Sequence, residues 1–280
     1  MADSKPRGSS EPYKSKNPKY VDLISRGVRG PSPAGTLTFI GLRTLDIPLQ
    51  YALLGRGLGA SLLMKLGLTP ISAQPAFRTG FTAIDSLGLP LPQLIMLLMT
   101  VGGAMRHYYW IGFLSNEKFA VKSALAMTVY TSLMNVIGSI LITSAATSSI
   151  NSTWRIPRID LPASIVIGFA GFLLGTLFET GSDHQRKVFK DKPENQGKVC
   201  TVGFWKYARH INYGGYVLWR SAYVLAATGW IGALATAAVH GSDLGTRGVA
   251  TMDEYMSFRY GEQWRQYKAK VTYKLFPGVY

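Results

Sequence analysis

A run of polar and aromatic residues between positions 179 and 213 could bind a charged ligand with a planar base. Arg and Lys donate charge-assisted hydrogen bonds to phosphate, amides can bond to sugar hydroxyls or a carboxamide, and aromatic rings can stack on a base. The polar and aromatic residues of this run include Asp183, Gln185, Lys190, Asn195, Trp205, Arg209, His210, Asn212 and Tyr213. An interfacial belt of aromatic and basic residues would account for Trp219 and Trp230, but it does not require a His and an Asn beside an Arg.

The segments that must position these groups are apolar. Residues 86–105, 123–154, 161–178 and 221–242 contain no Asp, Glu, Lys or Arg, and about 20 apolar residues suffice for a helix to cross a bilayer. Within the second stretch, residues 143–153 are expected to be a loop. Residues 36–66 predict one imperfect crossing and an interfacial piece, because Arg43, Asp46, Pro48 and several glycines interrupt them. We therefore predict an all-α, multi-pass transmembrane helical bundle of about six spans.

Basic residues set the expected orientation. They concentrate in residues 183–220 and again in residues 247–274, and both segments should be cytoplasmic. A single crossing between them would put them on opposite sides. We therefore predict a helical hairpin over residues 212–249 that turns near Thr228, Gly229 and Trp230, with both termini cytoplasmic and cofactor-binding loops on the same side. The predicted regions are a disordered basic tail at 1–34, transmembrane helices at 35–178 and a cofactor-binding module at 179–280.

Composition narrows the class of protein. Only 16% of the 280 residues are charged, against about 25% in soluble proteins. The net charge of +15 suggests lipid headgroups or a phosphorylated ligand, and nucleic acid is not expected because the basic residues flank apolar spans. The single Cys200 excludes an internal disulfide framework. His184, His210, His240 and Cys200 lack the spacing of metal ligands, so no metal is expected.

Three ordered motifs resemble one family. The stretch Gly203-Phe-Trp-Lys-Tyr-Ala-Arg-His-Ile-Asn-Tyr-Gly-Gly resembles the "G-x-W-x-x-S-R-H-P-N-Y-x-G-E" signature of the steroid 5α-reductase-like family, which includes the DUF1295 branch. Residues 179–189 resemble the family's "E…D-x-Q-K…F" lead-in, and residues 248–280 resemble its "Y-G-x-x-W/Y-x-x-Y…P" ending. Ile211 stands in place of the family proline, Ala208 in place of a small hydroxyl residue and Tyr216 where an acid is common.

The resemblance implies a membrane-embedded, NADPH-dependent reductase of a double bond in a sterol or other lipid-like substrate, located in the endoplasmic reticulum. The resemblance implies that the nine residues named in the first paragraph of this section contact the cofactor. It adds Asp253 and Tyr260 to these contacts. The proton donor lies on earlier helices in this family, so the catalytic candidates are Tyr108, Tyr109 and Glu117, with His107 and Tyr130 as further possibilities. Tyr108 and Tyr109 would also suit a membrane anchor, and Asn135 is expected to make a helix–helix hydrogen bond.

Two alternatives stay open. Isoprenylcysteine and phospholipid methyltransferases share a similar "R-H-P-x-Y" module but use S-adenosylmethionine. The Asp183-x-Gln185 lead-in, Asn212 and a basic loop suited to a 2′-phosphate favour the reductase. The missing acid at Tyr216 leaves open a non-catalytic member of the fold.

Overall fold

The computed structural model describes residues 25–280, so most of the predicted tail at 1–34 lies outside the described residues. The described chain is almost entirely helical, which confirms the all-α prediction. The main helices are α1 (Pro33–Gly55), α2 (Leu58–Lys65), α3 (Thr82–Asp85), α4 (Leu91–Tyr109), α5 (Val121–Thr143), α6 (Ala163–Asp191), α7 (Ile211–Thr228), α8 (Trp230–Asp243), α9 (Val249–Tyr260) and α10 (Glu262–Lys270).

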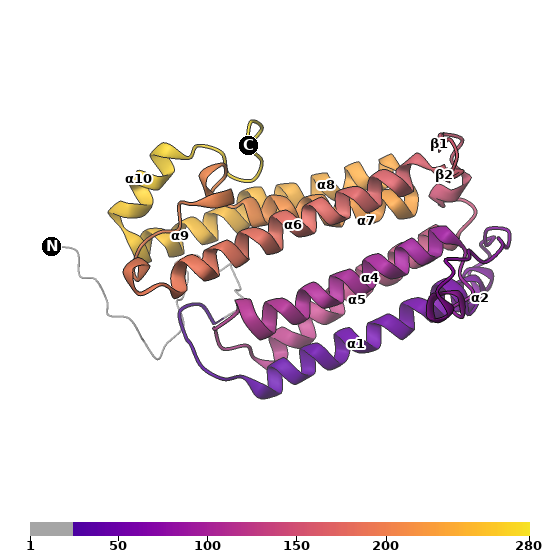
Figure 1. Ribbon diagram of the computed structural model, residues 1–280, viewed down its shortest axis with the longest axis horizontal. Coiled ribbons are helices and arrows are strands. Elements are labelled where there is room, and N and C mark those ends of the chain that lie inside the picture. Colours follow the sequence, from indigo (N-terminus) through magenta and orange to yellow (C-terminus); the bar gives the residue numbers. More distant parts are fainter. Residues whose placement is uncertain (1–24) are drawn as a thin grey trace.

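Short elements join the helices. Two π-helical segments, Trp110–Leu114 and Leu244–Gly248, extend α4 and link α8 to α9, and 3₁₀ turns occur at Ser149–Asn151, Pro193–Asn195 and Gly203–Lys206. Strands β1 (Arg155–Ile156) and β2 (Leu161–Pro162) pair antiparallel, with Arg155 opposite Pro162. Figure 1 shows these strands at one end of the bundle and α9 and α10 at the opposite end.

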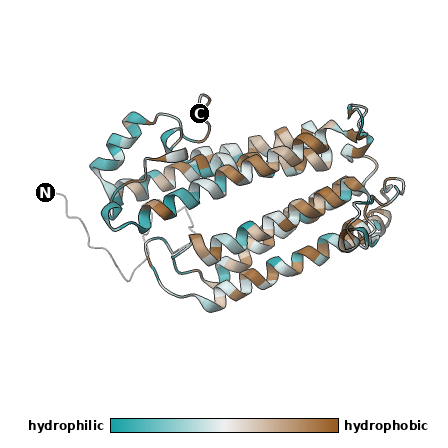
Figure 2. Ribbon diagram, in the orientation of Figure 1, coloured by the Kyte–Doolittle hydropathy of each residue, from teal (hydrophilic) through white to brown (hydrophobic). Residues whose placement is uncertain are grey.

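The long helices lie roughly parallel and pack in a defined order. Helix α1 packs against α4 and α5, α6 packs against α7, and α7 packs against α8 (Figure 1). A central apolar core joins α4, α6 and α7 through buried residues such as Met96, Phe172 and Tyr223. Hydrophilic residues gather at the end formed by α9, α10 and the C-terminal turns of α6, as Figure 2 shows.

Glycines allow α6 and α7 to approach closely. A Cβ atom on Gly175 would lie 2.4 Å from the backbone nitrogen of Trp219, and one on Gly215 would lie 2.4 Å from the backbone nitrogen of Glu179. Both distances are far inside van der Waals contact, so neither position can carry a side chain without separating the helices. This close pairing fixes the relative position of the two helices that carry five of the eleven predicted ligand-binding residues.

The predicted hairpin is confirmed. Helix α7 ends at Thr228 and α8 begins at Trp230, with Gly229 between them at φ 80°, a conformation that glycine adopts without steric cost. The chain reverses there, because α8 packs back against α7 and Gly241 lies beside Val217. The N-terminus of α7 and the segment that follows α8 therefore return to the same end of the bundle.

Two helices among the described residues, α5 and α6, are long and apolar enough to cross a membrane. The finer prediction of about six spans is not established by this criterion. The prediction that Arg43, Asp46 and Pro48 interrupt the first helix is wrong, since α1 continues through all three. The expected break at the glycines is present, because α1 ends at Gly55 and α2 begins at Leu58. Its charges are accommodated inside the bundle, where Arg43 pairs with Asp46 at 2.6 Å.

Neighbouring side chains satisfy the hydrogen-bonding capacity of the Asp46 carboxylate. Its carboxylate also accepts hydrogen bonds from Gln50 at 2.9 Å and from Asn135 of α5 at 2.8 Å. The Asn135 bond confirms the expected helix–helix contact. Buried polar groups are tolerated when they are satisfied in this way.

The helix boundaries before the motif region also differ from expectation. Helix α6 continues to Asp191, so the predicted loop does not begin at Asp183, and the proposed regions 35–178 and 179–280 meet within one helix. No Pro interrupts the chain between Pro162 and Pro193, and the helix ends only just before Pro193. Asp183, Gln185 and Lys190 therefore project from a rigid helix rather than from a loop.

Candidate functional site

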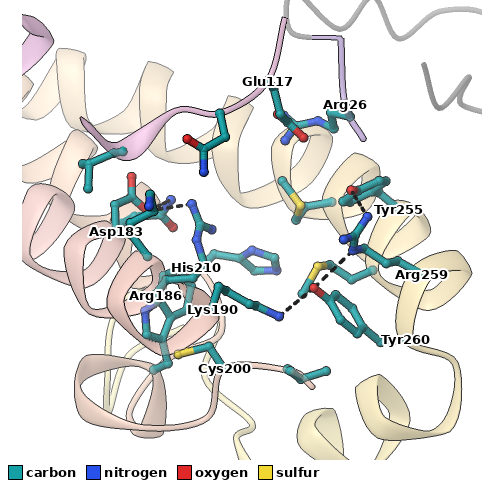
Figure 3. A pocket seen from close by; sticks show the side chains of 18 of the residues that line it. Arg26, Glu117, Asp183, Arg186, Lys190, Cys200, His210, Tyr255, Arg259 and Tyr260 are labelled. Atoms are coloured by element: carbon teal, nitrogen blue, oxygen red, sulfur yellow. Dashed lines mark hydrogen bonds and ion pairs between the residues drawn. The ribbon is translucent and has the colours of Figure 1, made fainter. Parts of the chain in front are cut away.

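A cavity of about 280 Å³ opens at the hydrophilic end of the bundle, near the lower limit of typical ligand pockets. It lies between the C-terminal turns of α6, the start of α7, helices α9 and α10, and the segment 114–117 (Figure 3). Because α6 and α7 are held together by glycine contacts and the segment Leu244–Gly248 joins the hairpin to α9, three separate parts of the sequence meet here.

Positive charge exceeds negative charge around this cavity. The cationic residues that line it are Arg26, Arg29, Arg186, Lys187, Lys190, Arg209 and Arg259, and the acidic residues are Glu117, Asp183 and Asp191. A recess lined by an excess of one sign attracts a ligand of the opposite sign. Guanidinium and ammonium groups suit phosphate and carboxylate in particular, so the cavity is matched to an anionic ligand.

Two of these cations converge on one phenol. Lys190 donates a hydrogen bond of 2.7 Å to the Tyr260 hydroxyl, and Arg259 Nε lies 3.3 Å from the same oxygen (Figure 3). Burial alone would raise the pKa of Tyr260, but the charges and hydrogen bonds of Lys190 and Arg259 outweigh it and lower this pKa. Arg259 also donates to the Tyr255 hydroxyl at 3.2 Å. The cluster is therefore a preorganised, electropositive part of the wall.

His210 lies at the centre of the view in Figure 3 and is almost completely buried. Its ring stacks on Tyr213, with 5.4 Å between the ring centroids. Burial, and then the charge of Arg209, lower the pKa of His210 to about 3, so the imidazole is neutral near pH 7. Its Nε2 atom has no hydrogen-bond partner among the described residues, which leaves a buried polar atom available to a ligand.

Arg209 has a structural role that the motif alone does not reveal. Its Nη1 atom donates to the carbonyl oxygens of Val271 at 2.5 Å and Thr272 at 3.0 Å, and its backbone nitrogen donates to the carbonyl oxygen of Tyr273. These bonds hold the segment after α10 against the start of α7. The Arg209 Nε atom is buried and has no hydrogen-bond partner in the part of the chain that the structure describes.

Asp183 joins α6 to α7 at the cavity wall. Its carboxylate accepts a hydrogen bond from the Asn212 amide at 3.3 Å and pairs with Arg186 at 2.9 Å. Nearby, Trp205 donates to the backbone oxygen of Ser182 at 2.8 Å, and its own carbonyl oxygen accepts from the Tyr267 hydroxyl. Contacts between helices and turns thus hold the Asp183 carboxylate, the Asn212 amide and the Trp205 ring in place.

Eight of the eleven expected cofactor contacts line the cavity. The catalytic candidate Glu117 also lines it, and its carboxylate accepts a hydrogen bond from the backbone nitrogen of Gly27. Those eight are Asp183, Lys190, Trp205, Arg209, His210, Asn212, Tyr213 and Tyr260.

The remaining three expected cofactor contacts lie outside the cavity lining. Gln185 accepts a hydrogen bond from the backbone nitrogen of Phe204 at 2.8 Å, and Asn195 ends the 3₁₀ turn after α6. Asp253 accepts from the Trp264 indole at 2.7 Å and pairs with Lys268. In these positions, Gln185 and Asp253 brace the elements that form the wall.

Two catalytic candidates also lie away from the cavity. The Tyr108 hydroxyl lies 2.7 Å from the Thr44 hydroxyl, and the Tyr109 hydroxyl lies 2.6 Å from Nδ1 of the exposed His184. Both tyrosines belong to α4, which continues to Tyr109 rather than ending at residue 105.

The sequence interpretation missed several lining residues. Arg186 would have been found once α6 was extended, because it stands one turn after Asp183 and pairs with it. Arg259 and Tyr255 stand four residues apart on α9, and their helical spacing together with the neighbouring Tyr260 was an available signal. Arg26 and Arg29 carried no signal, since only the fold brings that segment to the cavity.

Comparison with known proteins gives relatives of two kinds. A protein of Ustilaginoidea virens named "Probable O-methyltransferase ustE" is 32% identical over 259 residues, which cover 92% of this chain and 89% of that protein. The "7-dehydrocholesterol reductase" of Danio rerio is 33% identical over 94 residues, covering 31% of this chain and 18% of that enzyme. The "Delta(14)-sterol reductase ERG24B" of Gibberella zeae is 26% identical over 156 residues, covering 39% and 32%.

The alignments to the two sterol reductases thus span less than a third of each enzyme's length. The profile of a family described as "Protein of unknown function (DUF1295)" matches residues 115–271, which include α5 to α9 and the cavity residues they carry. On this match, which spans more than half of its length, the chain belongs to the DUF1295 family.

Proposed function

We propose that this protein is a membrane-embedded reductase that uses NADPH to reduce a polarised double bond in a sterol or similar lipid. The observation that carries the proposal is the electropositive cavity, in which Lys190 and Arg259 converge on Tyr260. NADPH carries several phosphates, and a 2′-phosphate distinguishes it from NADH. S-adenosylmethionine carries no phosphate and has a positively charged sulfonium, which an excess of cations disfavours.

The residues of the cavity fit the parts of such a cofactor. Lys190, Arg259 and Arg186 would hold phosphate groups, while the Asp183–Asn212 pair offers an acceptor and an amide for ribose or carboxamide. The buried Nε2 of His210 has no hydrogen-bond partner among the described residues and would gain one from the ligand. When bound, the reduced nicotinamide supplies a hydride. The protein's own groups orient it and exclude water.

Membrane embedding is part of the proposal. Helices α5 and α6 satisfy the length and hydropathy expected of spans, and the hydrophilic residues concentrate at the end that holds the cavity (Figure 2). We infer that this end faces the cytoplasm, where NADPH is available, and that the lipid substrate reaches the site from the bilayer. The endoplasmic reticulum remains the proposed location.

Thermal unfolding of the purified protein with NADPH, NADH and S-adenosylmethionine tests the proposal. NADPH should raise the unfolding temperature most, because ligand binding to the folded state stabilises it by mass action. Arg259→Ala should weaken NADPH binding about tenfold or more, since a hydrogen bond to a charged group contributes about 1.5–3 kcal/mol. It should change NADH binding less.

Arg265→Ala is the matched control for charge. Arg265 is exposed, pairs with Glu262 on α10 and does not line the cavity, so its removal should leave the NADPH shift unchanged. Stabilisation by S-adenosylmethionine without stabilisation by NADPH would refute the reductase.

A second candidate, an S-adenosylmethionine-dependent methyltransferase, is favoured by one observation. The relative with similarity over nearly the full chain is named a probable O-methyltransferase. The neutral His210 and the aromatic wall formed by Trp205 and Tyr213 would also suit an adenine ring. The thermal-shift comparison separates the two, because the methyltransferase requires stabilisation by S-adenosylmethionine and no preference for the 2′-phosphate.

A further inference from the structure

A short segment before α1 forms one side of the cavity. Residues 25–32, here called the strap, precede the first helix, and Arg26, Gly27 and Arg29 line the cavity. Gly27 donates its backbone N–H to the Glu117 carboxylate at 2.8 Å, and Arg29 forms an isolated antiparallel β-bridge with the same residue. Figure 3 shows Arg26 beside Glu117 on this side of the cavity. Glu117 therefore holds the strap in place.

The strap extends from the segment 117–119 to helix α9. On one side, the backbone nitrogen of Lys118 donates to the carbonyl oxygen of Val28 at 2.9 Å. On the other side, a Cβ atom on Gly27 would lie 3.9 Å from the Tyr255 hydroxyl of α9. The strap therefore connects two walls of the cavity that are far apart in the sequence, and a ligand in the cavity lies beneath it.

A second cavity, of about 360 Å³, also borders the strap. Residues 30–32 of the strap line it, and it shares residues 115–117 with the first cavity. The first cavity, at about 280 Å³, is smaller than most ligand pockets, which occupy ~300–1,000 Å³. Movement of the strap away from Glu117 would join the two cavities into one whose volume falls within this range. A ligand with phosphates, sugar and base therefore requires the strap to move.

Two features allow the strap to move. Val28 is buried, but the other residues of the strap are partly or fully exposed, and a segment with few buried apolar contacts opens at low cost. Gly27 at φ 83° and Gly30 at φ 151° flank Val28 and Arg29. Glycine changes its backbone conformation without a Cβ penalty, as the hinges of a moving loop require. Opening of the strap therefore costs a few hydrogen bonds rather than the packing of the core.

We propose that the strap is a lid that opens to admit a phosphate-bearing ligand and closes over it, with Arg29 contributing to ligand binding and Glu117 holding the lid closed. This rests on the proposed function for the phosphates of the ligand. The Glu117 carboxylate holds the backbone of Gly27 whether or not a ligand is bound. A bound phosphate adds a second attraction, because the closed strap brings the positive charge of Arg29 to the cavity. Opening of the strap then limits the exchange of the ligand.

Digestion of the full chain in lipid nanodiscs by trypsin measures the opening of the strap, because trypsin cleaves after Arg26 and Arg29. Cleavage within a folded protein follows the population of the opened form. Glu117→Ala removes the acceptor of the Gly27 N–H, so cleavage at both sites should become about tenfold faster or more, as expected for loss of a hydrogen bond to a charged group. Glu117→Gln keeps an oxygen acceptor without the charge, so its cleavage should be at least about threefold slower than that of Glu117→Ala.

Cleavage after Arg78 is the internal control. Arg78 is exposed and lies between α2 and α3, and its neighbour Phe77 donates to the carbonyl oxygen of Leu89 just before α4 begins, whereas the cavity lies beyond the other end of α4. Its cleavage should be the same in all variants and with every ligand. NADPH and, separately, inorganic pyrophosphate should slow cleavage of the strap at least about threefold at saturation, since a ligand that binds the closed form reduces the population of the opened form.

The outcomes separate the strap from the proposed cofactor. Equal cleavage of the strap in the wild type, Glu117→Ala and Glu117→Gln would overturn the role of Glu117, and this comparison needs no ligand. Absence of protection by both NADPH and pyrophosphate would rule out closure over a phosphate-bearing ligand. Protection by pyrophosphate without a thermal shift from NADPH would support the strap and reject the cofactor of the proposed function.

Binding kinetics distinguish a lid from a fixed wall. In stopped-flow measurements of NADPH fluorescence, Glu117→Ala should raise both the association and the dissociation rate constants relative to Glu117→Gln, which loses the same charge. Rate constants that do not rise together would contradict a lid. Arg29→Ala should weaken NADPH binding about three- to tenfold, whereas Arg265→Ala should leave it unchanged. An unchanged affinity in Arg29→Ala would remove Arg29 from the ligand site.

Discussion

Substitution of Gly175 by alanine should separate the two helices that form the cavity. The added Cβ would lie 2.4 Å from the backbone nitrogen of Trp219 and 2.8 Å from the carbonyl oxygen of Gly215. Both are backbone atoms, which cannot rotate away as a flexible side chain can. Overpacking of this kind costs about 1–3 kcal/mol, while the replacement of glycine by alanine within a helix contributes up to about 1 kcal/mol in the opposite direction.

Comparison with Gly41→Ala isolates the steric cost of the Gly175→Ala substitution. Gly41 lies within α1, is exposed and would place its Cβ at least 4 Å from any other group, so this variant gains the helix propensity without a clash. The free energies of unfolding of the two variants should therefore differ by about 1–3 kcal/mol. At roughly 2–4 °C per kcal/mol for a chain of this size, thermal unfolding in the same detergent resolves the difference.

The effect should extend to ligand binding. Asp183 on α6 and Asn212 on α7 are joined across the helix pair, so separation of the helices at Gly175 should weaken that bond and reduce the thermal shift caused by NADPH. Equal stability of Gly175→Ala and Gly41→Ala would show that α6 and α7 do not depend on this contact, and the account of how the cavity is positioned would fail.

Three further predictions concern groups around the bundle. Between pH 7 and pH 5 the protein should lose about 2 kcal/mol of stability through His210, because burial lowers its pKa to about 3 while the unfolded imidazole, with a pKa of 6.5, takes up the proton; denaturant titrations should show less of this loss in His210→Gln. Asp46→Ala should cost about 3–5 kcal/mol in thermal unfolding by leaving Arg43 buried without its partner, whereas Asp243→Ala at the exposed pair with Arg247 should cost less than about 1 kcal/mol. Asp253→Ala should cost about 1–2 kcal/mol and increase hydrogen exchange in α10, because the Trp264 indole loses its acceptor.

The sequence permitted prediction of the helical class, the hairpin and much of the cavity for identifiable physical reasons. Charge-free stretches indicate helices directly, and the basic segments on both sides of residues 212–249 required a chain reversal, which Gly229 provides. The run from Arg209 to Tyr213 lies at the start of one helix, so these residues are close in space independently of how the other helices pack.

Other features depended on distant partners and could not be predicted in the same way. The continuity of α1 through Arg43 and Asp46 depends on their mutual ion pair and on Asn135, which is 89 positions from Asp46. Similarly, Gln185 and Asp253 have the polar character expected of ligand contacts, but their hydrogen bonds go to Phe204 and Trp264. Residue type indicates that a polar partner is needed and does not indicate whether it is a ligand or the protein itself.

The continuity of α6 has a consequence for how the site works. One helix passes Gly175, where it packs against α7, and then Asp183 and Lys190, which line the cavity. Lys190 lies 15 residues after Gly175, about 22 Å along the axis, so a small tilt at the glycine contact is amplified at the lysine. A ligand that bridges Lys190 and Tyr260 therefore resists that tilt and stabilises the contact between α6 and α7. Binding at the hydrophilic end and packing in the apolar core should accordingly be linked, and the thermal shift reports both.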